Sequence, residues 1–296
     1  MTDVVAILAN GLIYGSIYGL VAIGMTLVYG TLRILDMSQG SMVMVGGYVG
    51  WWALATHGVN PVVALVLAFL FTFALGTASE LASVQPLIGR QKEVDFEMVT
   101  FITTFAVAIF LTNVALQHFG PFQKNVPSIV GGNLELLNGV SISYHELTMA
   151  AISVALIAGL GLFLARTRWG LAIRAVAQDL DAARSLAVPV TRLYPVTMGL
   201  ASALAGVGGV FVGGLFFASP TAGDLPLLYA LIVVVLGGLG SLPGTLYAAY
   251  LVGMMQSFCE VEIGTTWTLP ILYGAILLIL VFRPNGLKGS PAEARL

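Results

Sequence analysis

The sequence predicts an all-α integral membrane protein, folded as a polytopic helical bundle of about eight or nine spans with broken or re-entrant helices. Of its 296 residues, 58% are hydrophobic and only 9% are charged, whereas a soluble domain carries about 25% charged residues. Its 12 basic and 14 acidic side chains could not cover so apolar a globule. The apolar runs are also long and continuous rather than alternating in polarity, which excludes a β-barrel.

The spans are predicted from runs of about 20 largely apolar residues, the length that crosses a bilayer core about 30 Å thick. Charged residues or Pro, Gly and Asn mark the breaks between them. In order, the runs are 4–30, 38–56, 61–85, 98–118, 146–165, 192–213, 225–239, 242–259 and 267–283. The first has no basic residue before it and is expected to be a retained span, not a signal peptide. The seventh is short enough to be broken or re-entrant.

The distribution of basic residues predicts the orientation. With the N-terminus outside and the C-terminus inside, eleven of the twelve Lys and Arg residues fall on or beside the cytoplasmic face, and only Lys124 lies outside. This is the asymmetry of the positive-inside rule. The eleven are Arg33, Arg90, Lys92, Arg166, Arg168, Arg174, Arg184, Arg192, Arg283, Lys288 and Arg295. The chain is expected to form one transmembrane domain, 1–296, with an extracytoplasmic loop at 119–145 and a cytoplasmic loop at 166–191.

Small residues recur at four-residue spacing on two helices, which favours close helix packing in lipid. Such ridges serve either packing within one chain or a subunit interface. The residues are Gly11, Gly15 and Gly19 on the first span, and Ala205, Gly209 and Gly213 on the sixth.

Polar residues interrupt the apolar sequence just before the second span, at Asp36, Ser38, Gln39 and Gly40. A helix broken here would point Ser38, Gln39 and free backbone N–H groups into a cavity of the bundle. The alternative is that Asp36 or Ser38 simply caps a helix at the cytoplasmic surface.

A second break lies at 237–244, which reads GGLGSLPG. Irregular backbone at membrane depth is tolerated only where protein buries it or where it lines a wet cavity. Gly237, Gly238, Gly240 and Ser241 are therefore candidates to line a path through the bundle. The alternative is an ordinary tight turn at the cytoplasmic surface.

The loop at 166–191 is predicted to contain a short amphipathic helix. Asp179 can cap it, Asp181 lies in its first turn, and Val188-Pro189 ends it. Leu180, Ala183, Leu186 and Ala187 are expected along one side. Such a helix either rests at the membrane interface or docks a cytoplasmic partner. The candidate contact residues are Arg174, Asp179, Asp181, Ala183, Arg184 and Leu186.

The chemistry missing from the sequence narrows the function. There is no Gly-x-x-x-x-Gly-Lys-Ser/Thr loop, no zinc-protease motif and no serine-hydrolase elbow. One cysteine and a net charge of -2 exclude a multi-cysteine metal site and a nucleic-acid partner. Glu260 and Glu262 are expected at a solvated outer rim. A transporter without its own ATP site or proton relay needs an external energy source, which favours a permease subunit driven by a separate ATPase. A passive channel remains the alternative.

Three motifs in order along the chain resemble the permease family of bacterial ABC importers for branched-chain amino acids. They are Gly11–Gly30 (GLIYGSIYGLVAIGMTLVYG) with the break at 36–40, Arg174–Arg184 (RAVAQDLDAAR) and Gly237–Gly244 (GGLGSLPG). The resemblance covers about 5–285 and is stronger for the smaller of the family's two permeases. It implies a non-catalytic subunit of the bacterial inner membrane, paired with a homologous second permease, two cytoplasmic ATPases and a periplasmic solute-binding protein. The chain itself is expected to hold no cofactor or metal, because the ATPases would bind ATP and Mg²⁺.

The same resemblance implies roles for the motifs. The 179–187 helix would be the coupling helix that docks into an ATPase, and the two breaks would line the path. Two positions depart from the family pattern. Asp36–Gly40 stands where members commonly read Asn-Phe-Ala-His-Gly, so the solute is expected to be a branched-chain amino acid or a related small polar or carboxylated compound. Ala187 replaces a common glycine and is expected only to stiffen the helix end. A stand-alone channel for urea or an amide is the alternative function.

Overall fold

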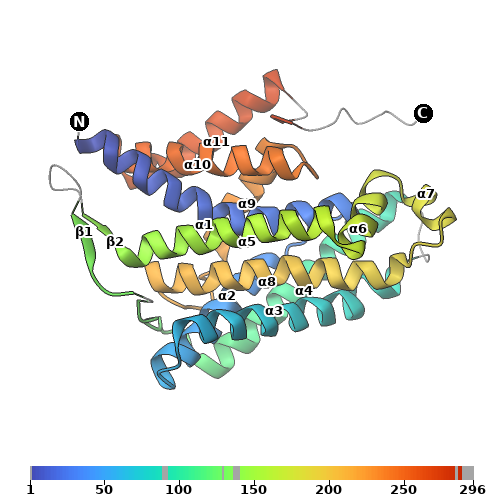
Figure 1. Ribbon diagram of the computed structural model, residues 1–296, viewed down its shortest axis with the longest axis horizontal. Helices are drawn as coiled ribbons and strands as arrows, with labels where there is room; N and C mark the ends of the chain where they lie inside the picture. The colour runs from blue at the N-terminus through green and yellow to red at the C-terminus, as the bar shows by residue number, and fades with distance from the viewer. Residues whose placement is uncertain (1, 89–92, 129, 136–140, 284–285, 289–296) are drawn as a thin grey trace.

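The chain folds into a bundle of long helices (Figure 1). The computed structural model describes residues 2–88, 93–128, 130–135, 141–283 and 286–288. Over this part of the chain the secondary structure is helical except for one two-stranded antiparallel sheet. The predicted fold class, a helical polytopic membrane protein, is confirmed.

The elements follow one another along the chain as a series of helices interrupted once by the sheet. They are α1 (Thr2–Leu32), α2 (Gln39–Trp51), the π-helix η1 (Trp52–Thr56), α3 (Pro61–Ser83), the 3₁₀ helix η2 (Gln85–Leu87), α4 (Glu93–Phe119), β1 (Asn133–Glu135), β2 (Ser141–Ser143), α5 (Tyr144–Arg166), α6 (Arg168–Gln178), α7 (Leu180–Ser185), α8 (Val190–Leu215), α9 (Asp224–Gly237), α10 (Leu242–Glu262) and α11 (Thr265–Phe282).

The helices differ in length. Among the described residues, five helices are long and apolar enough to cross a membrane, namely α1, α3, α4, α5 and α8. By contrast, α2 has 13 residues and α9 has 14, which at about 1.5 Å per residue gives about 20 Å of helix. These two helices are therefore shorter than the hydrocarbon core of a bilayer, about 30 Å.

Side chains at the helix starts explain several boundaries. The N–H of Val62 donates to Asn60 Oδ1 at 2.9 Å, with Pro61 in the first helical position of α3. Ser143 and Glu146 form a reciprocal capping box at the start of α5. Ser241 caps α10 by accepting from the N–H of Gly244. Each cap satisfies backbone donors that the first turn of a helix leaves without partners.

The core forms around α8. In α8, 89% of an apolar stretch of 18 residues is buried, whereas in α4 the corresponding share is 17%. α8 packs on α1, α2 and α3. Its contact with α2 is made by backbone, because a Cβ on Gly46 would meet the carbonyl oxygen of Gly206 and a Cβ on Gly209 would meet that of Val43. Glycine lets these two helices approach closely.

A second close crossing joins α1 to α10. A Cβ on Gly11 or Gly15 would lie about 2.9 Å from the Cα atom of Met254 or Tyr250 respectively, and Gly253 faces both glycines from α10. Gly19 packs against Ala249 of the same helix, Gly213 against Val126, and Ala205 is fully buried. Both small-residue ridges noted in the sequence thus face other elements of the same chain.

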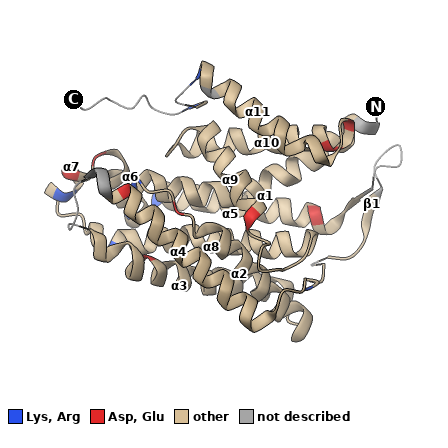
Figure 2. Cartoon of the chain, turned by 180° about the vertical axis from the view of Figure 1, so that it is seen from behind, with Lys and Arg blue, Asp and Glu red and all other residues tan. Residues whose placement is uncertain are grey.

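The two ends of the bundle differ in character. The N-terminus, β1 and β2 lie at one end, and α6 and α7 lie at the other (Figure 1). Most of the Lys and Arg positions lie at the end that carries α6 and α7 (Figure 2). Following the predicted orientation, we name these the outer end and the inner end. Arg90, Lys92 and Arg295, which contributed to that prediction, lie outside the described residues.

Candidate functional site

A cavity of about 440 Å³ lies at the outer end of the bundle, and we name it the outer cavity. It is bounded by α1, by the outer ends of α8 and α10, and by the segment that leads into α9. Its lining residues are Tyr14, Ile17, Tyr18, Gln123, Val212, Leu215, Phe216, Phe217, Ser219, Thr221, Ala222, Leu225, Pro226, Tyr229, Gln256 and Glu260. Most of this wall is apolar or aromatic, with a few polar groups, as is typical of small-molecule sites.

Three tyrosines form one wall of the outer cavity. Tyr14 and Tyr18 lie four residues apart, which places both on the same face of α1. Their ring centroids are 6.2 Å apart, and the Tyr18 ring stacks on that of Tyr229 at 4.4 Å with an interplanar angle of 14°. The stack ties α1 to α9, and all three tyrosines line the cavity.

Beside the stack, α10 contributes a polar pair. Gln256 Nε2 donates to Glu260 Oε1 at 2.8 Å. The Tyr14 hydroxyl lies within hydrogen-bonding reach of Glu260. Glu260 is the one charged side chain among the described residues that line the cavity. Glu260 was expected at a solvated outer rim, and the structure places its partly exposed side chain in the lining of this outer cavity.

The break at 36–40 lies halfway along the bundle. The N–H of Met37 donates to Thr104 Oγ1 at 3.3 Å, and Ser41 Oγ donates to the carbonyl of Ala108 at 3.1 Å. Both partners belong to the middle of α4, whose apolar span runs from Phe96 to Phe119. α2 therefore begins inside the bundle and not at its inner surface.

Asp36 organises this start of α2. Its Oδ1 accepts from the N–H and hydroxyl of Ser38 at 2.9 and 2.7 Å, and its Oδ2 accepts from Gln39 Nε2 at 2.8 Å. All three side chains are fully buried. Gly40 is buried beside Gly223, which precedes α9. None of these four predicted path residues lines the outer cavity; Asp36 instead accepts hydrogen bonds from the two residues at which α2 begins, Ser38 and Gln39.

A second cavity, of about 300 Å³, lies at the inner end, and we name it the inner crevice. It brings Gly240 and Ser241 of the second break against Arg174 and Gln178 of α6 and Thr31 of α1. Gly238 and Gly240 have positive φ angles of 99° and 83°, which favour glycine. Gly237 packs against Gly244 across the turn. Of the four residues predicted to line a path at this break, Gly240 and Ser241 thus line a cavity.

The chain beyond α11 closes the end of α9. The N–H of Leu287 donates to the carbonyl of Leu236 at 2.8 Å, and that of Lys288 donates to the carbonyl of Gly237 at 3.2 Å. The Lys288 ammonium lies 4.4 Å from the ring centroid of Tyr247. These contacts satisfy carbonyls that the last turn of a helix leaves free.

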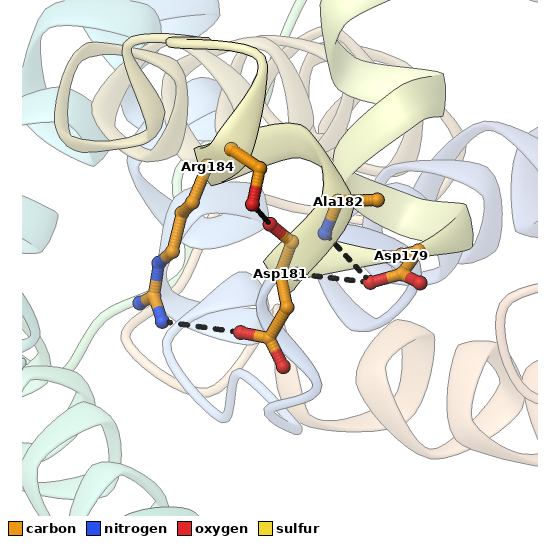
Figure 3. Close-up of polar contacts among 5 residues, drawn as sticks. Asp179, Asp181, Ala182 and Arg184 are labelled. Carbon is orange, nitrogen blue, oxygen red and sulfur yellow. Dashed lines mark hydrogen bonds and ion pairs between the residues drawn. The ribbon is translucent and has the colours of Figure 1, made fainter.

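The loop at the inner end contains two helices, α6 and α7. The sequence did not predict α6. Thr167 caps this helix, and Ile173 and Val176 anchor it in the core. Asp179 Oδ1 caps α7 by accepting from the N–H groups of Asp181 and Ala182 at 2.9 and 3.0 Å (Figure 3).

The exposed side of α7 carries charge and one apolar residue. Arg184 and Asp181 form an ion pair at 3.7 Å, with both side chains largely exposed (Figure 3). Ala183 is buried, whereas Leu186 is 78% exposed. The apolar side predicted for this helix is therefore split, because Ala183 holds α7 on the bundle while Leu186 projects away from it.

Ala187 adopts a left-handed conformation, with φ of 57°. Its N–H and that of Val188 donate back into α7, to the carbonyls of Arg184 and Ala183 at 3.0 and 3.1 Å. Such a helix end favours glycine, because a Cβ in this region costs about 1–2 kcal/mol. The expectation that alanine here only stiffens the helix is wrong, since the residue is strained.

Comparison with known proteins identifies the family. Residues 7–281 match the family described as branched-chain amino acid transport system, permease component. The chain is 32% identical to the high-affinity branched-chain amino acid transport system permease protein BraD of Pseudomonas aeruginosa, over 96% of this chain and 95% of that protein. It is 28% identical to the permease protein LivH of Escherichia coli, over 95% and 94%, and 27% identical to a probable LivH of Methanocaldococcus jannaschii, over 96% and 92%. The chain belongs to the family of permease components of branched-chain amino acid transport systems, as its sequence motifs predicted.

Proposed function

We propose that this protein is a transmembrane subunit of an ATP-driven importer in the bacterial inner membrane, with its N-terminus outside and its C-terminus inside. Its solute is a branched-chain amino acid or a related small polar or carboxylated compound. A homologous second permease, two cytoplasmic ATPases and a periplasmic solute-binding protein complete the transporter. The family match over residues 7–281 is the observation that carries this proposal.

The arrangement of the cavities supports a path through the chain. α9 begins beside the outer cavity, where Leu225, Pro226 and Tyr229 line it, and ends at the turn whose Gly240 and Ser241 line the inner crevice. α9 thus runs from the outer cavity to the turn at the inner crevice, and α1 and α10 line both cavities. The delivered solute enters the outer cavity and leaves on the cytoplasmic side once the contacts around α9 and the 238–241 turn open.

The loop at 166–191 supplies the coupling to ATP hydrolysis. An ATPase would contact the exposed side of α7, which presents Asp181, Arg184 and Leu186. α7 is held on the bundle by Ala183, and the adjoining α6 places Arg174 in the inner crevice beside Ser241. A displacement of α7 would therefore be transmitted to the inner crevice through the short helix α6. ATP and Mg²⁺ bind to the ATPases.

Uptake by the reconstituted transporter tests the proposal. The complex is assembled in proteoliposomes with ATP inside and leucine-loaded binding protein outside, and the double variant Asp181→Ala/Arg184→Ala is compared with wild type. We expect ATP-driven uptake to fall at least about tenfold with normal membrane insertion, because the variant removes charged contacts from the ATPase interface. Glu262→Ala, an exposed acidic residue at the outer end, is the control and should transport normally.

Copurification provides an independent test of the partners. The tagged chain extracted in mild detergent should bring two ATPases and a second permease with it. Two outcomes would favour a facilitator over an importer. They are full uptake by the double variant without ATP, and a chain that purifies alone and conducts solute. An active homodimer of this chain with the ATPases would refute the heteromeric pairing.

A further inference from the structure

We propose that Gln256 and Glu260 form a recognition site for a primary ammonium group in the outer cavity, with the aliphatic part of the solute against the apolar wall. This rests on the proposed function in so far as the outer cavity belongs to the import path. The binding chemistry of the site depends only on the side chains named below, and a separate experiment tests it.

The hydrogen bonding of Gln256 leaves its side-chain oxygen without a donor. Its side chain is 5% exposed and lines the cavity. The orientation of the Gln256 amide is fixed, because its Nε2 donates to the Glu260 carboxylate. If the amide were turned over, its oxygen would face the carboxylate and repel it. No donor among the described residues reaches Gln256 Oε1. A buried acceptor without a donor costs about 1–3 kcal/mol, which a ligand N–H group would recover.

Glu260 adds the charge. An ammonium group has three donors and no acceptor, so it matches a site made of the amide oxygen of Gln256 and a carboxylate oxygen of Glu260 that the Gln256 amide does not use. Among the described residues no Lys or Arg lines the cavity, and the nearby Lys124 ammonium lies 5.3 Å from the ring centroid of Trp51 instead. The cavity therefore favours a cation over an anion at this end.

The aromatic wall strengthens the same preference. Tyr14, Tyr18 and Tyr229 line the cavity together with the polar pair, and a tyrosine hydroxyl oxygen can accept a hydrogen bond from an ammonium group. Farther along the cavity, Phe216 and Leu225 expose apolar surface toward its interior. A branched aliphatic chain would cover this surface once the ammonium group is bound. The volume of about 440 Å³ is within the range of small-molecule sites.

Direct binding to the full-length permease in nanodiscs tests the site without ATPases or binding protein. Two probes carry the same branched tail, namely isopentylammonium, which is a cation, and 4-methylpentanoate, which is an anion. Ligand-detected saturation-transfer NMR measures their dissociation constants. We expect the cation to bind at least about fivefold more tightly than the anion, and Glu260→Gln to weaken the cation by about fivefold or more. Gln256→Leu should weaken it as well.

The control is Glu262→Gln, which removes the same charge two residues farther along, at an exposed side chain outside the cavity lining. It should leave cation binding unchanged. Glu260→Gln keeps an oxygen that can accept from Gln256 Nε2, so its fold should be preserved, and a thermal melt verifies this. Equal binding of the two probes, or equal losses in Glu260→Gln and Glu262→Gln, would overturn the site.

The outcomes separate this inference from the proposed function. Selective cation binding in a protein that supports no ATP-driven uptake would uphold the site and reject the importer. ATP-driven leucine uptake by a protein that does not discriminate between the two probes would uphold the importer and reject the site.

Discussion

Gly40, in the first turn of α2, lies directly against Gly223, the residue before α9. A methyl group added to either glycine would meet a carbonyl oxygen of the other. The two short helices thus start at the same depth, side by side, and run from there toward opposite ends of the bundle. Because each contributes bare backbone, neither tolerates a side chain at this contact.

Gly223→Ala is therefore expected to destabilise the protein by about 1–3 kcal/mol, the usual cost of forcing an extra carbon into a packed interior. The apparent melting temperature in detergent should fall. Gly159→Ala is the matched control, because nothing lies within 4 Å of the Cβ position of Gly159 on α5. An unchanged melting temperature for Gly223→Ala would show that the two helix starts separate readily.

Ala187→Gly should stabilise the inner loop. The residue has φ of 57°, and removal of its Cβ relieves about 1 kcal/mol of strain. Hydrogen exchange of the α7 amides should slow by about fivefold as a result. The same replacement at Ala182, inside α7, should instead speed exchange, since glycine weakens a helix by about 1 kcal/mol. Faster exchange in both variants would contradict the assigned strain.

Gln39→Leu is expected to impair uptake severalfold while expression and ATPase association remain normal. It removes the donor to Asp36 Oδ2 and leaves a buried carboxylate oxygen unpaired, at a cost of about 1–3 kcal/mol at the start of α2. Transport kinetics of the assembled importer provide the measurement.

Asp36→Asn tests whether the charge of Asp36 matters. No donor among the described residues reaches Gln39 Oε1, so the Gln39 amide can turn and accept from the new Asn side chain. If Asp36 serves only as the acceptor for Ser38 and Gln39, uptake by this variant should stay within about threefold of wild type. A loss as large as that of Asp36→Leu would assign a role to the negative charge itself.

Leu186→Ser should weaken ATPase association about tenfold. The side chain is 78% exposed in this chain, and burying a leucine at an interface contributes about 1.5–3 kcal/mol. Titration of the purified ATPase onto the permease in nanodiscs measures the change. Phe122→Ser, an exposed apolar residue at the outer end, should leave the affinity unchanged. Equal affinities for wild type and Leu186→Ser would place the ATPase contact elsewhere.

Much of the fold followed from hydropathy, because each of the nine predicted apolar runs contains a helix. The sites followed less directly. The break at Asp36 was visible as polar residues in an apolar stretch, but its burial depends on Thr104 and Ala108, which are distant in sequence. Gln256 and Glu260, like Tyr14 and Tyr18, are four residues apart and share a helix face, but no motif marked them and they were not predicted as site residues. That the two faces meet is a property of the packing of α1 on α10.

On the proposed path, the short helix α9 spans the distance between the outer cavity and the turn at the inner crevice. From Tyr229, which lines the outer cavity, to Gly237, where the helix ends, there are eight residues, or about 12 Å of helix. This is less than half of the roughly 30 Å hydrocarbon core. This length of helix is not much greater than the length of an amino acid. Small movements at the two ends of α9 would then open the proposed path, and simultaneous movements at both ends would create a leak.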